Sequence, residues 1–269
     1  MPYLAFDMEI ATPVADEADL LASRPGIACA AFIREGDTRP LVIFDPATSA
    51  DMFVPATKAL TQEGATRILE ELIAADDRGD TILTWNGAGF DFRLLADETG
   101  RHADCARLAR HSVDMMFQVL CDRGHPLALD TALAGMGLPS KIHTVTLADG
   151  RTVEVDGRLA PQLWQAGEHE AVMIYCGGDV AGTLALALAC RDRKRLTWIS
   201  RAGKTNHMKL GARWLTVEEC LALPKPDTSW MTNPLRPEDV VSWMTKNASR
   251  SEPTRAVSGS EPGSGRLFE

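Results

Sequence analysis

Two acidic residues are separated by a single residue in the apolar segment Leu4-Ala5-Phe6-Asp7-Met8-Glu9-Ile10. Because the side chains of a strand alternate between the two faces of a sheet, Asp7 and Glu9 would project from the same face. Like charges at this spacing repel each other unless a cation lies between them. The pair is therefore a candidate for half of a divalent-metal site, and the alternative is two solvated charges at a strand end.

A third carboxylate follows a second apolar strand pattern, Thr81–Trp85, in the segment Asn86-Gly87-Ala88-Gly89-Phe90-Asp91. Two glycines permit a tight turn from strand to helix, and Asp91 falls in the first helical turn, where the helix dipole favours a negative charge. Ligands of open α/β sheets usually bind at the carboxyl edge of the strands. The segment predicts an ionised carboxylate at that edge, unless Asp91 is only an acid at a helix N-terminus.

A fourth carboxylate lies in the long helical pattern from Glu168 to Arg193. Tyr175 and Asp179 are four residues apart and therefore share one helix face. Gly177 and Gly178 lie between them, although each glycine costs about 1 kcal/mol relative to alanine in a helix interior. We interpret the glycines as the place where the helix approaches the sheet or a substrate closely, and a kink without function is the alternative.

The elements that must position these side chains follow from the hydrophobic periodicity. Short apolar runs predict three strands, then an amphipathic helix with Thr61 as its N-cap, and then a fourth strand that returns to the sheet in parallel. Helical patterns dominate from Asn86 to Cys190. We expect an α/β fold with a ribonuclease H-like mixed sheet, built as a three-strand meander followed by a helix and parallel strands and flanked by helices. The predicted ranges are Tyr3–Glu9, Gly26–Arg34, Pro40–Phe44, Thr61–Arg78 and Thr81–Trp85.

The chain of 269 residues is long enough for one substantial domain and an appendage. We expect a core domain over 1–195, with a β-hairpin insertion at about 143–156 around the Asp149-Gly150 turn. This hairpin could guide a substrate end or be a decorative loop. Residues 196–247 hold four of the six tryptophans and would dock on the core as a C-terminal extension, with base stacking as the alternative. Residues 248–269 are rich in Ser, Gly, Pro and Glu and predict a disordered tail.

Charge and cysteine usage limit the partners. The net charge of −9 disfavours phosphate binding over the whole surface, yet eight basic residues stand against one acid between Arg191 and Arg213. Part of this stretch, with Lys194 and Arg195, is expected to contact phosphate, and a solvated helix end is the alternative. Six scattered cysteines without a C-x-x-C pair predict reduced, buried thiols. We expect no membrane segment and a cytoplasmic location.

Taken in order, Phe6-Asp7-Met8-Glu9, Asn86-x-x-x-Phe90-Asp91 and Tyr175-x-x-x-Asp179 resemble motifs I, II and III of the DEDD 3′-5′ exonucleases, in the Tyr-containing (DEDDy) subclass. The similarity spans residues 1–195, and motif II is most similar to the exonuclease domains of family B DNA polymerases and related stand-alone proteins. The other subclass has a histidine five residues before the last Asp, where this chain has Ile174.

The resemblance implies a metal-dependent exonuclease that hydrolyses phosphodiester bonds at the 3′ ends of single-stranded DNA or RNA. Two divalent cations, Mg²⁺ or Mn²⁺, would be bound by the four carboxylates, and Tyr175 would orient the attacking water. Asn86 and Phe90 would position the terminal nucleotide. The alternatives are a structure-selective endonuclease on the same fold and a catalytically silent module that either binds nucleic acid or acts as an adaptor. The implied metal ligands are Asp7, Glu9, Asp91 and Asp179.

Several other residues are interpreted as structural. Asp114 is expected to be a helix cap or a support of the site, Asp130 an N-cap, and Lys141 a solvated loop lysine, with phosphate contact as its alternative. The last residues, Arg266-Leu267-Phe268-Glu269, faintly resemble sliding-clamp-binding peptides and indicate a weak protein partner. The preference for DNA or RNA and the pathway stay open.

Overall fold

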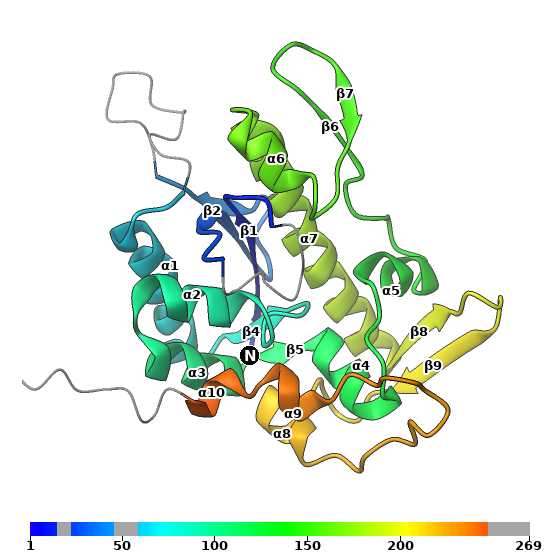
Figure 1. The fold of residues 1–269 in the computed structure, drawn as a ribbon. Coiled ribbons are helices and arrows are strands. Elements are labelled where there is room, and N and C mark those ends of the chain that lie inside the picture. The colour runs from blue at the N-terminus through cyan, green and yellow to red at the C-terminus, as the bar shows by residue number, and fades with distance from the viewer. Residues whose placement is uncertain (15–22, 46–58, 247–269) are drawn as a thin grey trace, which may run out of the picture.

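The computed structural model describes residues 1–14, 23–45 and 59–246, so the predicted C-terminal tail lies outside the described residues (Figure 1). Strands and helices alternate as the hydrophobic periodicity predicts, within one or two residues at each end. The strands are β1 (Tyr3–Ile10), β2 (Ile27–Arg34), β3 (Leu41–Ile43), β4 (Thr81–Thr84), β5 (Val113–Asp114), β6 (Thr144–Thr146), β7 (Thr152–Glu154), β8 (Arg195–Ile199) and β9 (Thr205–Lys209). The helices are α1 (Gln62–Asp77), α2 (Asp91–Thr99), α3 (His102–His111), α4 (Met115–Arg123), α5 (Leu129–Gly135), α6 (Ala160–Gln165), α7 (His169–Arg193), α8 (Val217–Leu221), α9 (Pro237–Val240) and α10 (Trp243–Lys246).

The central sheet has five strands in the order β3-β2-β1-β4-β5. The meander β1-β2-β3 is antiparallel, whereas β4 pairs in parallel with β1 and β5 pairs in parallel with β4. The helix α1 makes the crossover from β3 to β4, and Thr61 caps it by accepting a hydrogen bond from the Gly64 amide. This topology confirms the predicted α/β class with a ribonuclease H-like mixed sheet.

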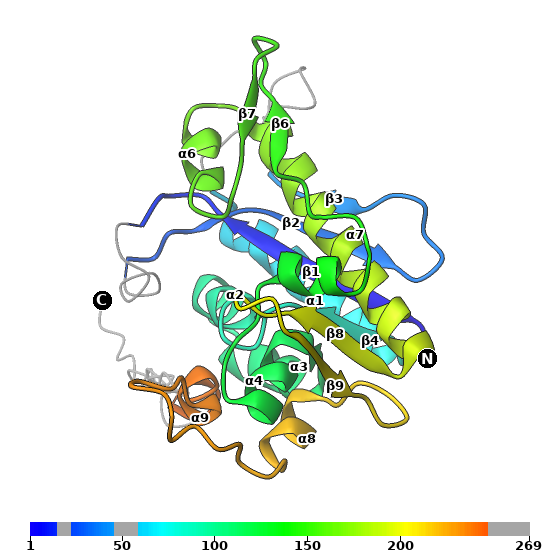
Figure 2. The same ribbon diagram turned by 90° about the vertical axis from the view of Figure 1, so that its right-hand side faces the viewer.

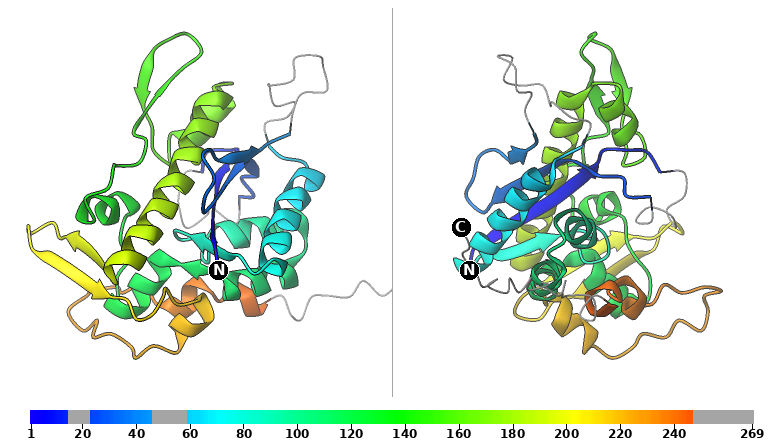
Figure 3. Two further views of the ribbon diagram at one scale, coloured as in Figure 1. Left: turned by 180° about the vertical axis from the view of Figure 1, so that it is seen from behind. Right: turned by 60° about the vertical axis from the view of Figure 1, so that its left-hand side comes forward.

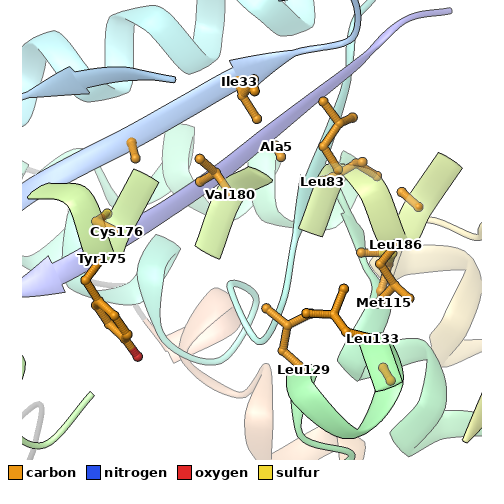
Figure 4. Close-up of a cluster of buried hydrophobic side chains, with 14 of the residues drawn as sticks. Ala5, Ile33, Leu83, Met115, Leu129, Leu133, Tyr175, Cys176, Val180 and Leu186 are labelled. Carbon is orange, nitrogen blue, oxygen red and sulfur yellow. The ribbon is translucent and has the colours of Figure 1, made fainter. Parts of the chain in front are cut away.

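Alternation along β1 separates two apolar layers, one on each face of the sheet. The helices α1 and α2 lie on one side of the sheet and the long helix α7 on the other (Figures 2 and 3). Leu4 and Phe6 belong to the buried cluster that includes residues of α1 and α2, while Ala5 belongs to the cluster that includes residues of α7. Val180 and Leu186 of α7 lie in the same buried cluster as Ala5 (Figure 4). By the same alternation, Asp7 and Glu9 face α7 rather than α1 and α2.

The helix α7 is the element that connects the sheet to the fourth carboxylate. By length and apolar composition it is the one helix of the described chain that could cross a bilayer, with a mean hydropathy of 1.6 in its most apolar window. However, 61% of that window is buried inside the protein, and α7 lies across β1 and β2 (Figure 2). These contacts show that α7 packs as a core helix of the protein.

Two further hairpins extend the sheet domain. β6 and β7 pair in antiparallel fashion and project beside α6, and β8 pairs with β9 against α5. Trp198, Trp214 and Trp243 are buried, whereas Trp230 is 68% exposed. The residues after α7 thus pack on the core through three tryptophans, and the division of the chain into domains stays a prediction.

Candidate active site

Asp7 and Glu9 lie near the carboxyl end of β1 on the face toward α7. Glu9 is only 7% exposed, and Asp7 is partly buried. The register of pairing with β2 shifts between Glu9 and Ile10, directly after the acidic pair. The strand therefore presents both carboxylates at the edge of the sheet, as the alternation predicts.

Asp91 is the first residue of α2, the helix that follows β4. Because β4 is the neighbour of β1 in the sheet, the Asp91 side chain reaches β1. Its Oδ1 accepts a hydrogen bond from the Met8 amide at 3.0 Å, so motif II is fixed directly to the segment between Asp7 and Glu9. Burial, assisted by the Asp114 carboxylate, raises the pKa of Asp91 to about 7. Part of the Asp91 population is therefore protonated at neutral pH unless a cation compensates its charge.

The Asp114 carboxylate stabilises the turn before Asp91 through hydrogen bonds. It accepts hydrogen bonds from the amides of Asn86 (3.0 Å), Ala88 (2.9 Å) and Phe117 (2.9 Å). Asp114 is thus the N-cap of α4, as predicted, and also fixes the turn in which Asn86 adopts a φ of 74°. A positive φ is uncommon outside glycine and is retained where the surroundings enforce it.

The C-terminal segment with α9 and α10 also contacts this turn, and the sequence did not indicate that contact. The Trp243 indole Nε1 donates a hydrogen bond to the Ala88 carbonyl at 2.8 Å. Gly89 lies so close to α9 that a Cβ at this position would be 2.8 Å from Val240 Cγ1. Segments 155 residues apart therefore fix motif II together.

Replacing Trp243 by phenylalanine should lower the free energy of unfolding by about 1–2 kcal/mol, because a smaller aromatic ring replaces the indole and the buried Ala88 carbonyl loses its donor. Urea denaturation measures this change. Trp230→Phe is the matched control, since its indole also donates to a carbonyl, that of Asp227 at 3.1 Å, but at an exposed position. Equal losses in both variants would contradict the role of the buried bond.

Tyr175 and Asp179 project from α7 beside Lys141, a residue outside the three motifs. Lys141 Nζ lies 2.6 Å from Asp179 Oδ2 and 2.8 Å from Tyr175 Oη. The interpretation of Lys141 as a solvated loop lysine is wrong, because its side chain is only 19% exposed and binds both residues. The prediction of Asp130 as an N-cap is also wrong: Ala128 caps α5, and Asp130 instead accepts a hydrogen bond from the Lys141 amide at 3.0 Å.

The close approach of the Lys141 loop depends on Gly178. A Cβ at Gly178 would lie 2.6 Å from Ile142 Cδ1, whereas a Cβ at the adjacent Gly177 would lie 3.5 Å from Pro40 Cγ, an ordinary contact. Gly178 alone thus marks a close approach, and it is to the loop of Lys141 and Ile142 and not to the sheet or a substrate as interpreted from the sequence; α7 continues through the pair to Arg193. This pair was the only sequence signal for the placement of Lys141.

Gly177→Ala and Gly178→Ala form a matched pair for this contact. Both replacements favour the helix by up to about 1 kcal/mol, but only Gly178→Ala must displace Ile142, at a cost of about 1–3 kcal/mol. We expect Gly177→Ala to raise or keep the melting temperature and Gly178→Ala to lower it, as measured by calorimetry. Identical shifts of the melting temperature in the two variants would show that the loop of Lys141 and Ile142 moves aside without an energetic cost.

The electrostatics of the cluster favour a divalent cation. Burial raises the pKa of Asp7 well above its usual value, and Asp91 and Asp179 raise it further; burial and Asp7 do the same for Glu9. Burial also raises the pKa of Asp179 despite the opposing effect of Lys141. Asp179 Oδ1 is buried and has no hydrogen-bond partner in the described part of the chain. An orphaned carboxylate oxygen among mutually repelling carboxylates fits a site for hard cations.

These side chains line a cleft of 1370 Å³ at the carboxyl edge of β1 and β4. Asp7 and Glu9 come close enough for one ion, in a group with Cys176 whose ligand atoms all lie within 4.8 Å of one another; Asp91 and Asp179 are not in this group. Seven predicted site residues line the cleft: Asp7, Glu9, Asn86, Phe90, Asp91, Tyr175 and Asp179.

The structure does not bring Lys194 and Arg195 to this cleft. Lys194 follows the last residue of α7, fifteen positions after Asp179, which is about 22 Å along the helix at ~1.5 Å per residue. Other members of the basic stretch have internal partners: Arg191 pairs with Glu35 at 2.9 Å and Arg213 with Glu219 at 2.6 Å. These two of the eight basic residues therefore stabilise the fold through ion pairs.

Comparisons with solved structures find exonuclease I. The chain is similar to Escherichia coli exonuclease I in complex with a dT13 oligonucleotide, at 18% identity and a TM-score of 0.38, over 72% of this chain and 41% of the other. It is likewise similar to exonuclease I from Methylocaldum szegediense, at 17% identity and a TM-score of 0.34, over 72% and 41% of the two chains. The match thus spans about two fifths of these proteins. No protein-family model matches the chain, and no curated protein matches it.

Proposed function

We propose that the protein is a metal-dependent 3′-5′ exonuclease of the Tyr-containing DEDD type, acting on single-stranded DNA or RNA ends. The observation that carries this proposal is the convergence of the three motifs on one cleft. β1 contributes Asp7 and Glu9, α2 contributes Asp91, and α7 contributes Tyr175 and Asp179. At the position where the other subclass has a histidine, Ile174 is 49% exposed and apolar, which favours the tyrosine type.

The four carboxylates would hold two Mg²⁺ or Mn²⁺ ions, with Asp7 and Glu9 nearest to each other. Bound there, the ions would supply an activated water and stabilise the charge on the leaving 3′ oxygen. The Met8 amide keeps Asp91 turned toward the pair, and Lys141 keeps Asp179 in place from the opposite side. The chain itself thus supplies ligands that are already oriented.

Tyr175 acts in this proposal as a hydrogen-bond donor. A lysine ammonium has only donors, so the Tyr175 oxygen accepts from Lys141 and keeps its own proton available for a further acceptor. Burial raises the pKa of Tyr175, with a contribution from Asp179, so the phenol stays protonated at neutral pH. The hydroxyl can therefore orient an attacking water and is not suited to remove its proton.

Aromatic residues of the cleft wall suit an unpaired nucleotide. Trp85 and Phe90 line the cleft beside Asn86, at the end of β4 and the start of α2. Flat rings accept any base by stacking, at about 1–3 kcal/mol per base. This wall supports the assignment of the terminal nucleotide to Asn86 and Phe90.

A 5′-labelled oligonucleotide assay with Mg²⁺ or Mn²⁺ tests the proposal. We expect a ladder that shortens from the 3′ end and disappears with EDTA or in Glu9→Gln. Circular single-stranded DNA should stay intact, and its cleavage would favour the endonuclease. Absence of any metal-dependent product on DNA and RNA would reject the nuclease function. Parallel DNA and RNA substrates identify the preferred sugar.

A further inference from the structure

Cys176 places a thiol at the base of the carboxylate cluster. It follows Tyr175 on α7 but lies on the side of the helix that faces the sheet, and Figure 4 shows the two side chains leaving the helix in different directions. Its Sγ is 3.7 Å from the Asp7 carbonyl oxygen. One ligand atom each from Asp7, Glu9 and Cys176 lie within 4.8 Å of one another. Carboxylate oxygen and sulfur donors therefore surround one point.

A second, independent observation comes from Glu9. The residue is more than nine-tenths buried, and within residues 1–14, 23–45 and 59–246 its carboxylate has no hydrogen-bond or ion-pair partner. Glu9 also lines the cleft, so its carboxylate oxygens are open to a cation, which they would bind as hard oxygen ligands. Its ligand atom belongs to the same group as the Cys176 sulfur, so the unpartnered group is aimed at the thiol.

A second thiol supports the sulfur character of this place. Cys29 on β2 is the direct cross-strand partner of Glu9 and is fully buried. Side chains of directly paired residues lie on the same face, so Cys29 also faces α7, where its thiol contacts that of Cys176. Two fully buried thiols therefore lie next to the acidic pair, outside the lining of the cleft itself.

We propose that Asp7, Glu9 and Cys176 form a binding site for thiophilic divalent cations of the Zn²⁺ and Cd²⁺ class. Mg²⁺ takes oxygen ligands and would leave the sulfur unused, whereas Zn²⁺ and Cd²⁺ accept thiolate and carboxylate together. On binding, the Cys176 S–H bond breaks, a sulfur–metal bond forms, and the proton leaves to solvent. Because the site takes Asp7 and Glu9, such a cation competes with the ions of the proposed nuclease.

Cadmium titration of the reduced, metal-free protein tests this proposal without any activity measurement. We expect an ultraviolet thiolate-to-cadmium absorption band that saturates at one equivalent in the wild type and is lost in Cys176→Ala. Cys190→Ala is the matched control, because Cys190 is equally buried and lies on the same helix. Its band should equal that of the wild type. An unchanged band in Cys176→Ala, or no band in the wild type, would overturn the proposal.

Asp7→Asn provides a second variant that leaves every thiol in place. It should weaken cadmium binding by about 10–100-fold. Equal cadmium affinity in the wild type and Asp7→Asn would show that the Asp7 carboxylate is not a ligand of this site. Circular dichroism verifies that each variant is folded. The inference and the proposed nuclease fail separately: a Cys176-dependent band without Mg²⁺-dependent cleavage rejects only the nuclease, and cleavage with a band independent of Cys176 rejects only this site.

Discussion

Replacing Asp7 by asparagine is expected to abolish nuclease activity while making the metal-free protein more stable. The carboxylate is a proposed metal ligand, so kcat should fall by about 10³-fold or more, equivalent to ~4 kcal/mol of transition-state stabilisation. In the absence of metal the same carboxylate is partly buried and is repelled by Asp91 and Asp179. Removing its charge should raise the free energy of unfolding by about 1–3 kcal/mol, measured by urea denaturation in EDTA.

The stability of the metal-free protein should also depend on pH, in a direction that the raised pKa values determine. Asp91 has a folded pKa of about 7, and those of Asp7 and Glu9 are also raised, so the folded protein binds more protons than the unfolded chain from pH ~4 upward. The stability of the metal-free wild type relative to Asp7→Asn should therefore fall as pH rises through this window. Mn²⁺ should reverse the fall in the wild type only.

A surface acid serves as the control for this experiment. The Asp192 side chain is 76% exposed and lies 3.9 Å from Arg191. Asp192→Asn should therefore leave kcat unchanged and alter the free energy of unfolding by no more than about 0.5 kcal/mol. If Asp7→Asn behaves as Asp192→Asn does, the carboxylate cluster has no role in metal binding.

Replacing Lys141 by alanine should lower kcat by about 10²-fold and change KM much less, because Lys141 positions two residues of the site, Tyr175 and Asp179. Without it, Tyr175 loses its donor and Asp179 stays buried without a counterion. Although burial lowers the pKa of Lys141, the Asp179 carboxylate more than offsets this and raises it, so the ammonium stays charged. Lys141→Arg should restore part of the rate.

Lys225 offers a matched ion pair for this prediction. Its Nζ lies 2.6 Å from Glu238, the same distance as in the pair of Lys141 with Asp179, but Lys225 is 84% exposed. Breaking a buried pair costs about 3–5 kcal/mol and breaking a surface pair at most about 1 kcal/mol. Steady-state kinetics and calorimetry on Lys141→Ala and Lys225→Ala separate the two cases. Equal effects would mean that Lys141 acts only as a surface charge.

The sequence by itself determined the order of the elements and the faces on which the motif residues lie. The period of two along Tyr3–Ile10 predicts that Asp7 and Glu9 share a face, and the spacing of four predicts that Tyr175 and Asp179 share another. The cap at Thr61 and the parallel return at Thr81 were also predictable. All of these follow from local geometry, which repeats within a few residues and is therefore readable along the chain.

Only the tertiary structure decided which other residues join the motifs. Lys141 reaches Asp179 across 38 positions, and Trp243 reaches Ala88 across 155. It also removed Lys194 and Arg195 from the cleft, because a straight helix carries them about 22 Å away. Such contacts depend on the path of irregular loops and on packing between layers. Periodicity specifies the face of an element but not the loop that will lie against it.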